Sequence, residues 1–304
     1  MNIEAKNKSY VLITPAYNEE DNLPRLAESI INQNLKPVMW VIVNDGSSDA
    51  TGTIVDELAA QHEFIHAVHV DPASKKGLYY AKKIHAFNAG YAYLEKQDID
   101  YLCLGNLDAD ISMPADYYDN VVSTFAANND LGVAAGSYRY SDGVSKVQWS
   151  GNYVPGSILM SRRACYEQVD GYRALKYGAE DTLLCIMAEQ YGWRVQYLPQ
   201  FQVVQHRVVG TAEDTSFVEA RYRQGLSEQN VGYSLPYALG KFVRGAFLHK
   251  PYFFGSFCRF AGYVAGFFQA DDGLVPPETK KFLRHKQLVQ MKLKPNKANP
   301  HSQS

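Results

Sequence analysis

Strand-like and helix-like patterns alternate along the first 140 residues. Continuous or alternating apolar runs predict buried strands at Tyr10–Thr14, Val38–Asn44, Phe64–Val70 and Tyr101–Leu107. Between the first two strands, Leu23, Leu26 and Ile30 recur at helical spacing, and similar patterns follow the later strands. Strands that alternate with helices predict a mostly parallel sheet with helices on both faces.

The rest of the chain has a different pattern. Gly-rich turns, one helix at Asp181–Tyr191 and two short strands ending at Gln205 are expected first. From 214 onwards the pattern is helical and increasingly aromatic, and the last residues are polar with two prolines. We therefore expect three parts: a domain at 1–213 with halves at 1–140 and 141–213, a helical extension at 214–291, and a disordered tail at 292–304.

Charge is unevenly distributed over the 304 residues. The net charge is −2, but residues 1–220 carry a balance of −11 and residues 221–304 a balance of +9. A basic, aromatic-rich C-terminal part suggests a negative partner, either nucleic acid or an anionic membrane surface. The four cysteines are widely spaced and the first residues lack an apolar signal segment, so we expect a protein of the reducing cytoplasm.

Polar side chains follow three of the predicted strands. The sequences PAYNE after the first strand, NDGSSD after the second and DAD after the fourth are expected to meet at one edge of the sheet. Asn, Asp, Gly and Ser are also ordinary turn residues, so a single loop of this kind would have little meaning. Three loops in this order indicate a ligand site, where Tyr17 could stack on a base and Asp45 could accept hydrogen bonds from it.

Asp108 and Asp110 stand two residues apart after an apolar strand, so their carboxylates can point the same way. Two hard oxygen donors suit Mg²⁺ or Mn²⁺ rather than zinc. Two ionised carboxylates this close also repel each other, and a dication would relieve that cost. A pair of solvated loop acids is the alternative interpretation.

The motifs TPAYNEE, NDGSSD and LDAD, in this order, resemble the inverting nucleotide-sugar glycosyltransferases of family 2. The resemblance covers about residues 8–210 and implies a GT-A fold, a Rossmann-like sheet here extended by C-terminal helices. It also implies a nucleotide-sugar donor and a divalent metal, Mn²⁺ or Mg²⁺. The donor-binding residues implied are Thr14, Pro15, Tyr17, Glu19, Asp45, Lys83 and Asp108. Lys83 could equally be a solvated helix lysine.

The resemblance also assigns metal and acceptor residues. Asp108, Asp110 and His206 would contact the metal, although a lone histidine is as often structural. In GAED, Glu180 would line the acceptor pocket and Asp181 would be the general base, while first-turn acids at a helix start are the alternative. Two acceptor-side loops add Gly156 and Gly171. Asp170 stands where the family usually has a second glycine, which leaves the acceptor open.

The aromatic segment 242–268 is interrupted by charges and by Pro251, which favours helices in a membrane interface over a membrane-spanning helix. A helical subdomain packed on the catalytic body is the alternative, and nucleic acid is not expected. The sequence thus predicts a hexosyltransferase-type enzyme in cell-surface polysaccharide or glycolipid synthesis, with a glycan or lipid-linked acceptor. It would be peripheral on the inner face of the plasma membrane. The alternatives are a polyprenyl-phosphate sugar transferase and a non-catalytic sugar-nucleotide-binding module.

Overall fold

The computed structural model describes residues 8–71, 81–143, 154–207, 216–248, 253–269 and 273–292. Their internal contacts divide the chain into two compact units. The first unit comprises 1–78, 82–172 and 193–208, and the second comprises 79–81, 173–192 and 209–304. In this division the segment 173–192 groups with the C-terminal helices and not with the sheet. The expected domain boundary at 213 stays a prediction.

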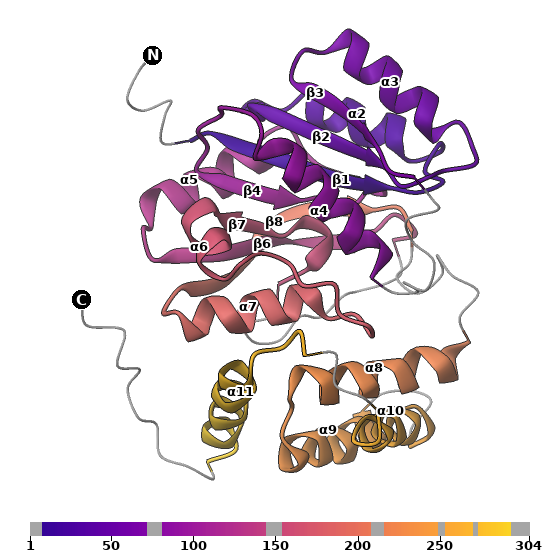
Figure 1. Cartoon of the computed structure of the whole chain (residues 1–304), viewed down its shortest axis with the longest axis vertical. Helices are drawn as coiled ribbons and strands as arrows, with labels where there is room; N and C mark the ends of the chain where they lie inside the picture. Colours follow the sequence, from indigo (N-terminus) through magenta and orange to yellow (C-terminus); the bar gives the residue numbers. More distant parts are fainter. Residues whose placement is uncertain are drawn as a thin grey trace. The chain divides into compact units, whose positions relative to one another are not determined.

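The first unit is built on one mixed sheet (Figure 1). Its strands are β1 (Tyr10–Ala16), β2 (Met39–Asn44), β3 (Ile65–His69), β4 (Cys103–Asn106), β5 (Ile111–Ser112), β6 (Leu131–Tyr140), β7 (Met160–Arg162) and β8 (Arg194–Gln205). Their order across the sheet is β3-β2-β1-β4-β7-β6-β8-β5. The four strands β1 to β4 pair in parallel, as do β6 and β8, whereas β7 and β5 pair antiparallel to their neighbours.

The helices of this unit are α2 (Leu23–Ile31), α3 (Thr51–Gln61), α4 (Lys82–Leu94), α5 (Tyr117–Ala127) and α6 (Arg163–Gln168), with a short 3-10 turn η2 (Gly156–Ile158). Gly90 of α4 lies over Ile13 and Val43, while Tyr118 of α5 stacks on Tyr10 with ring centroids 4.7 Å apart. Side chains of a strand alternate between the two faces, so Ile13 and Tyr10 mark opposite faces of β1. Helices on both faces of a mostly parallel sheet confirm the predicted fold class.

The two short strands expected before Gln205 form a single strand, β8. It pairs with β6 over residues 194–198 and 202–205, with register shifts between Leu131 and Val133 and between Gly136 and Ser137, where residues 199–201 have no partner in β6. Pro199 interrupts the apolar pattern of this strand, which is why the sequence suggested two pieces. All four cysteines lie in the described part of the chain, and each is a buried thiol.

The second unit is helical. It contains α7 (Glu180–Gln190), α8 (Phe217–Val231), α9 (Leu235–Leu248), α10 (Phe254–Gly266) and α11 (Pro277–Gln290). Helices α8 and α10 cross in backbone contact, because a Cβ on Gly225 would lie 1.9 Å from the carbonyl oxygen of Arg259 and a Cβ on Gly262 equally close to that of Tyr222. Any larger residue at either glycine would force the helices apart. Among the described residues, no helix has both the length and the apolarity needed to cross a membrane.

Candidate active site

The loops after β1 and β2 lie side by side because the two strands end in register. Ala16 is paired with Asn44, and the Asp45 amide donates to the Ala16 carbonyl at 2.8 Å. Asp45 is buried, whereas the Tyr17 side chain is 58% exposed. The structure therefore brings together an accessible aromatic ring and a sheltered carboxylate, the pair expected around a nucleoside. Thr14 is buried below them, and its hydroxyl accepts a hydrogen bond from the Trp40 indole at 2.9 Å.

Side chains of the two motifs hold these loops to each other. The backbone amide of Asn18 donates to the Ser47 hydroxyl at 3.0 Å, and the backbone amide of Ser48 donates to Oδ1 of the Asn18 side chain at 2.9 Å. Asn18 adopts a positive φ of 52°, which asparagine tolerates better than most residues. Part of the polar pattern is thus explained by loop structure, which leaves Tyr17 and Asp45 as the candidates for ligand contact.

Glu19 has an arrangement that the sequence pattern did not indicate. Its two carboxylate oxygens accept hydrogen bonds of 2.9 and 2.7 Å from the guanidinium of Arg207, which follows β8. Asn22 donates to the same carboxylate at 2.8 Å. These contacts give Glu19 a role in fixing the loop after β1, and its direct contact with a donor stays a prediction. Arg207 directly follows the histidine after β8, and that position is the only signal the sequence offered for it.

Asp108 and Lys83 form an ion pair of 2.5 Å between Nζ and Oδ1. Lys83 lies in the first turn of α4, and Asp108 follows β4 at the same edge of the sheet as the loops after β1 and β2. The Asp108 amide donates to the Ser157 carbonyl at 2.9 Å, and the Asn106 side chain donates to the Gly156 carbonyl at 2.9 Å. Lys83 therefore contacts Asp108, and Gly156 contacts Asn106, a supporting residue that the prediction omitted. The ligand roles of Lys83, Asp108 and Gly156 stay predictions.

Asp110 is 6% exposed and contacts the end of β8. Its Oδ2 accepts a hydrogen bond from the Gln205 side chain at 3.3 Å. Burial, and then the charge of Asp108, raise the pKa of Asp110 to about 6. The structure thus keeps a carboxylate where its negative charge is costly, which is typical of a site that receives a positive charge.

The backbones of His206 and Asp110 are joined by a hydrogen bond, in which the His206 amide donates to the Asp110 carbonyl at 2.8 Å. Its ring is directed elsewhere: His206 Nε2 and Ser112 Oγ share a hydrogen bond of 2.8 Å. Burial, followed by the charges of Arg25 and Arg139, lowers the pKa of His206 and so favours the neutral ring. Among the described residues, no three His, Cys, Asp or Glu side chains are grouped to hold a metal ion.

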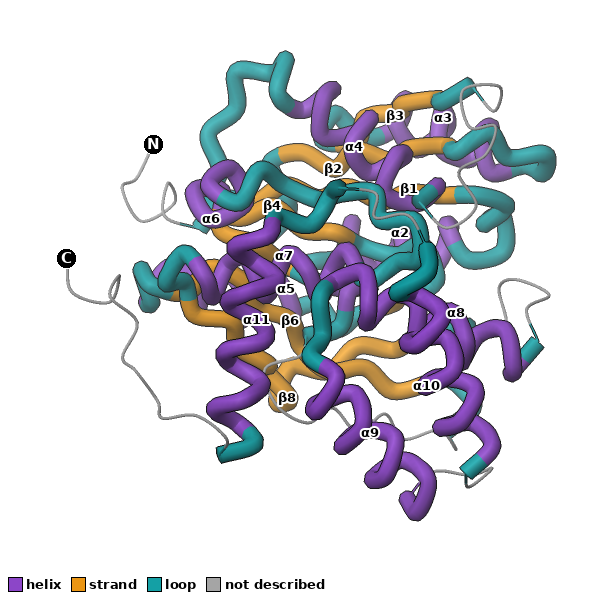
Figure 2. Tube along the Cα trace, turned by 60° about the horizontal axis from the view of Figure 1, so that its bottom comes forward, coloured by secondary structure: helices purple, strands orange, loops and turns teal. Residues whose placement is uncertain are grey.

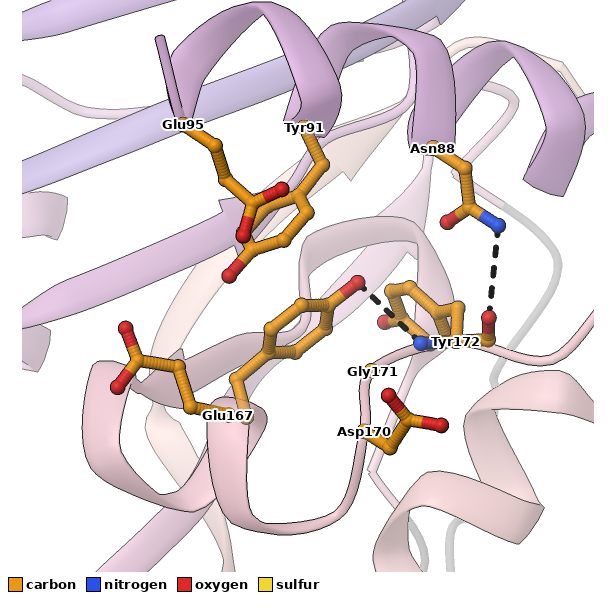
Figure 3. Close-up of a pocket in the computed structure, with 8 residues that line it drawn as sticks. Asn88, Tyr91, Glu95, Glu167, Asp170, Gly171 and Tyr172 are labelled. Carbon is orange, nitrogen blue, oxygen red and sulfur yellow. Dashed lines mark hydrogen bonds between the residues drawn. The ribbon is translucent and has the colours of Figure 1, made fainter. Parts of the chain in front are cut away.

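Gly171 lies at a cavity of about 350 Å³ in the first unit. The cavity is lined by Asn88, Tyr91, Glu95, Tyr166, Glu167, Asp170, Gly171 and Tyr172 (Figure 3). Gly171 has a φ of 63°, and a Cβ there would lie 2.9 Å from the Tyr166 hydroxyl. Only glycine fits this turn, so the turn geometry by itself explains why residue 171 is a glycine. Its contact with an acceptor stays a prediction. Residues 151–153 of the other acceptor-side loop lie outside the described residues.

Glu180 and Asp181 belong to the second unit, in the first turn of α7. The residue before the helix, Ala179, has a left-handed φ of 75°, and the Thr182 amide donates to Asp181 Oδ1 at 2.6 Å. The Ser227 hydroxyl of α8 donates to the Gly178 carbonyl at 3.1 Å. The turn that carries the predicted general base is thus fixed to the C-terminal helices of its own unit. The residues predicted to bind the nucleotide sugar and the metal all lie in the first unit.

Known proteins resemble this chain in sequence and in fold. The chain is 28% identical over 225 residues to the probable glycosyltransferase YdaM of Bacillus subtilis (65% of this chain, 50% of the relative). It is 32% identical over 144 residues to the polyprenol monophosphomannose synthase of Mycolicibacterium smegmatis (46% of this chain, 48% of the relative). The chain therefore spans about half the length of these two relatives.

The fold has a solved counterpart in a mannosyltransferase from Pyrobaculum calidifontis, a complex with GDP-Man and Mn²⁺. The TM-score is 0.54 at 17% identity, over 95% of this chain and 76% of the other. The family model described as "Glycosyl transferase family 2" matches residues 11–181, more than half of the chain. This match includes all three strand-end motifs, and the chain belongs to glycosyl transferase family 2.

Proposed function

We propose that this protein is an inverting, metal-dependent glycosyltransferase that moves one hexosyl unit from a nucleotide sugar to a hydroxyl group of a glycan or lipid-linked acceptor. The observation that carries the proposal is the pair of acids after β4. Asp108 is paired with Lys83, and the buried Asp110 has a pKa of about 6. A cation and two hard oxygen donors at one sheet edge suit a diphosphate with its metal ion.

The side chains at this edge fit a divalent metal, Mn²⁺ or Mg²⁺, held by Asp108 and Asp110. The two carboxylates supply oxygen ligands, which these metals prefer. A dication would also relieve the cost of ionising the buried Asp110. The metal would neutralise charge on the leaving diphosphate. His206 is a further candidate ligand if its ring leaves Ser112.

The chain's own residues have distinct roles in the proposed transfer. Tyr17 stacks on the base of the donor and Asp45 accepts hydrogen bonds from the nucleoside. Lys83 opposes the negative charge that grows on the leaving nucleoside diphosphate. Asp181 accepts the proton of the acceptor hydroxyl as its oxygen forms a bond to the anomeric carbon and the bond to the diphosphate breaks. A single displacement of this kind inverts the configuration at that carbon.

A polyprenyl-phosphate sugar transferase is the second candidate, favoured by the similarity to the polyprenol monophosphomannose synthase. Its acceptor phosphate is already ionised and would need no general base, so the two activities differ in their need for Asp181. For either activity we expect a peripheral protein on the cytoplasmic face of the plasma membrane, which places it near lipid-linked acceptors.

The test begins with a thermal-shift screen of nucleotide sugars with and without Mn²⁺. The donor that stabilises the protein only with the metal is then incubated with hydroxyl and polyprenyl-phosphate acceptors, and the product configuration is measured by NMR. We expect metal-dependent transfer to a hydroxyl with inversion. Transfer with retention, or turnover unaffected by a chelator, would contradict the proposal, and donor binding without turnover would indicate a binding module.

A further inference from the structure

One side of helix α9 exposes a row of apolar side chains. Leu235, Leu239, Val243 and Phe247 follow one another at four-residue spacing, with side chains 52%, 47%, 51% and 65% exposed. Residues four apart lie on the same side of a helix. The other exposed residues on this side are Pro236, Gly240 and Arg244. A helix surrounded by water normally presents the opposite pattern.

The neighbouring helix α10 continues this surface. Its exposed large side chains are Phe253, Phe254, Phe257, Val264, Phe267 and Phe268, including the residues that flank the helix. The exposed rings of Phe247 and Phe253 meet edge to face with centroids 5.3 Å apart, which joins the two helices into one surface. Helices α9 and α10 lie side by side in the second unit (Figure 2). We call these exposed apolar side chains of α9 and α10 the aromatic face.

Two of the charged side chains of these helices, Lys241 and Arg259, point inward, whereas Arg244 is exposed. Glu228 of α8 is 9% exposed and is paired with Lys241 of α9 and Arg259 of α10. Lys241 also lies over the ring of Tyr233 at 4.9 Å. The helices α8, α9 and α10 thus enclose an ion cluster while α9 and α10 expose the aromatic face. A contiguous exposed apolar surface of this kind typically marks an interaction site.

The charges around the aromatic face indicate what kind of surface it binds. Residues 235–268 contain no Asp or Glu, and Arg244 is exposed among the apolar residues of α9. Helices of 14 and 13 residues are about 20 Å long, too short to cross a hydrocarbon core of about 30 Å. Apolar helices of this length with cations and no acids are suited to lie flat in the interface of an anionic bilayer.

We infer that the aromatic face of α9 and α10 inserts into the surface of an anionic membrane, with the helix axes parallel to the bilayer plane and Arg244 at the lipid phosphates. The phenylalanine side chains enter the boundary between headgroups and acyl chains, while the ion cluster around Glu228 remains inside the protein. The inference rests on side chains of the helical unit alone and does not depend on the proposed transferase activity.

Flotation of the full chain with vesicles tests this inference. We expect the protein to float with vesicles that contain phosphatidylglycerol, to float less at high salt, and to stay unbound with phosphatidylcholine alone. The double variant Phe247→Ser/Phe257→Ser should lose about tenfold or more of this binding, because it removes two large apolar contacts from the bilayer. Arg244→Glu should weaken binding to anionic vesicles.

The matched control is Tyr191→Ser, because Tyr191 is a 46% exposed aromatic residue after α7, outside the aromatic face. It should bind vesicles like the parent protein. Circular dichroism should show unchanged folding of the double variant, since both phenylalanines are already exposed. Equal binding to neutral and anionic vesicles, binding to neither, or a dimer in solution that the double variant abolishes would overturn the inference. The last result would assign the face to a second copy of the chain.

Discussion

The guanidinium of Arg207 clamps the carboxylate of Glu19 through two hydrogen bonds of 2.9 and 2.7 Å, although 188 residues separate them in the sequence. The pair fastens the end of β8 to the loop after β1, and that loop carries Tyr17. The Glu19 side chain is only 11% exposed, and Arg207 is the cation paired with it. The ion pair therefore links the stability of the sheet edge to the position of the candidate donor site.

Arg207→Ala should destabilise the protein by about 1–3 kcal/mol, because it leaves a mostly buried carboxylate without its cation. Chemical denaturation followed by circular dichroism measures this change. The double variant Glu19→Ala/Arg207→Ala should recover part of the loss, since it removes the uncompensated charge as well. An Arg207→Ala protein as stable as the parent would contradict a structural role for the pair.

Lys83→Met should weaken binding of the nucleoside diphosphate about tenfold or more, as expected for losing one charge-assisted contact. Isothermal calorimetry with Mn²⁺ present measures the affinity. The adjacent exposed Lys82 provides the control, because Lys82→Met removes the same charge one residue away from the pair with Asp108. Equal losses in the two variants would assign the effect to overall charge rather than to Lys83.

Asp110→Asn should abolish the dependence of nucleoside diphosphate binding on Mn²⁺, because the amide is a poorer ligand and carries no charge. Titration of the diphosphate with the metal and with a chelator measures this dependence. Asp116→Asn, at an exposed acid before α5, should leave it unchanged. The metal assignment would be wrong if Asp110→Asn retained the affinity of the parent with Mn²⁺.

Asp181→Asn should reduce transfer to a hydroxyl acceptor by about 10²–10⁴-fold, because the amide cannot accept the proton. Donor binding and thermal stability should persist. Glu180→Gln, one residue earlier in the same helical turn, should have a milder effect on acceptor use. If Asp181→Asn retained activity within about threefold of the parent, well short of a general base's contribution, another group would be the base.

Glu228 should make the stability of the helical unit depend on pH. Burial alone would raise the pKa of Glu228, but the charges of Lys241 and Arg259 outweigh burial and hold its pKa below the ordinary 4.5. A carboxyl group with a lowered folded-state pKa stabilises the protein above its unfolded-state pKa, and the contribution disappears as the pH falls through the folded-state pKa.

Thermal unfolding of Glu228→Gln and of the parent, followed from neutral to acidic pH, checks this expectation. The variant should be clearly less stable at pH 7, because Lys241 and Arg259 lose their shared anion. The difference should begin to shrink as the pH falls below about 4.5, where the unfolded parent takes up the proton, and it should vanish once the pH lies below the lowered folded-state pKa of Glu228. A difference that is constant over this range would exclude titration of Glu228 as its cause.

The positions of the three polar loops could be predicted from the sequence because they depend on local patterns. An apolar run predicts a buried strand, and the residue after its last apolar position lies at the sheet edge whichever strands become neighbours. Tyr17, Asp45 and Asp108 were placed at the site on this basis, and the structure puts them at the ends of adjacent strands. Family resemblance added Lys83, which does reach Asp108.

Tertiary structure alone decided which residues become partners over long distances. Nothing in the local pattern pairs Arg207 with Glu19, or directs the His206 ring to Ser112, because such contacts depend on how β8 is placed in the sheet. Hydrophobic periodicity likewise identifies a helix with an apolar side but not the direction in which that side faces. The apolar side of α9 faces outward while Lys241 pairs with Glu228 inside the unit, and only the packed helices could reveal this.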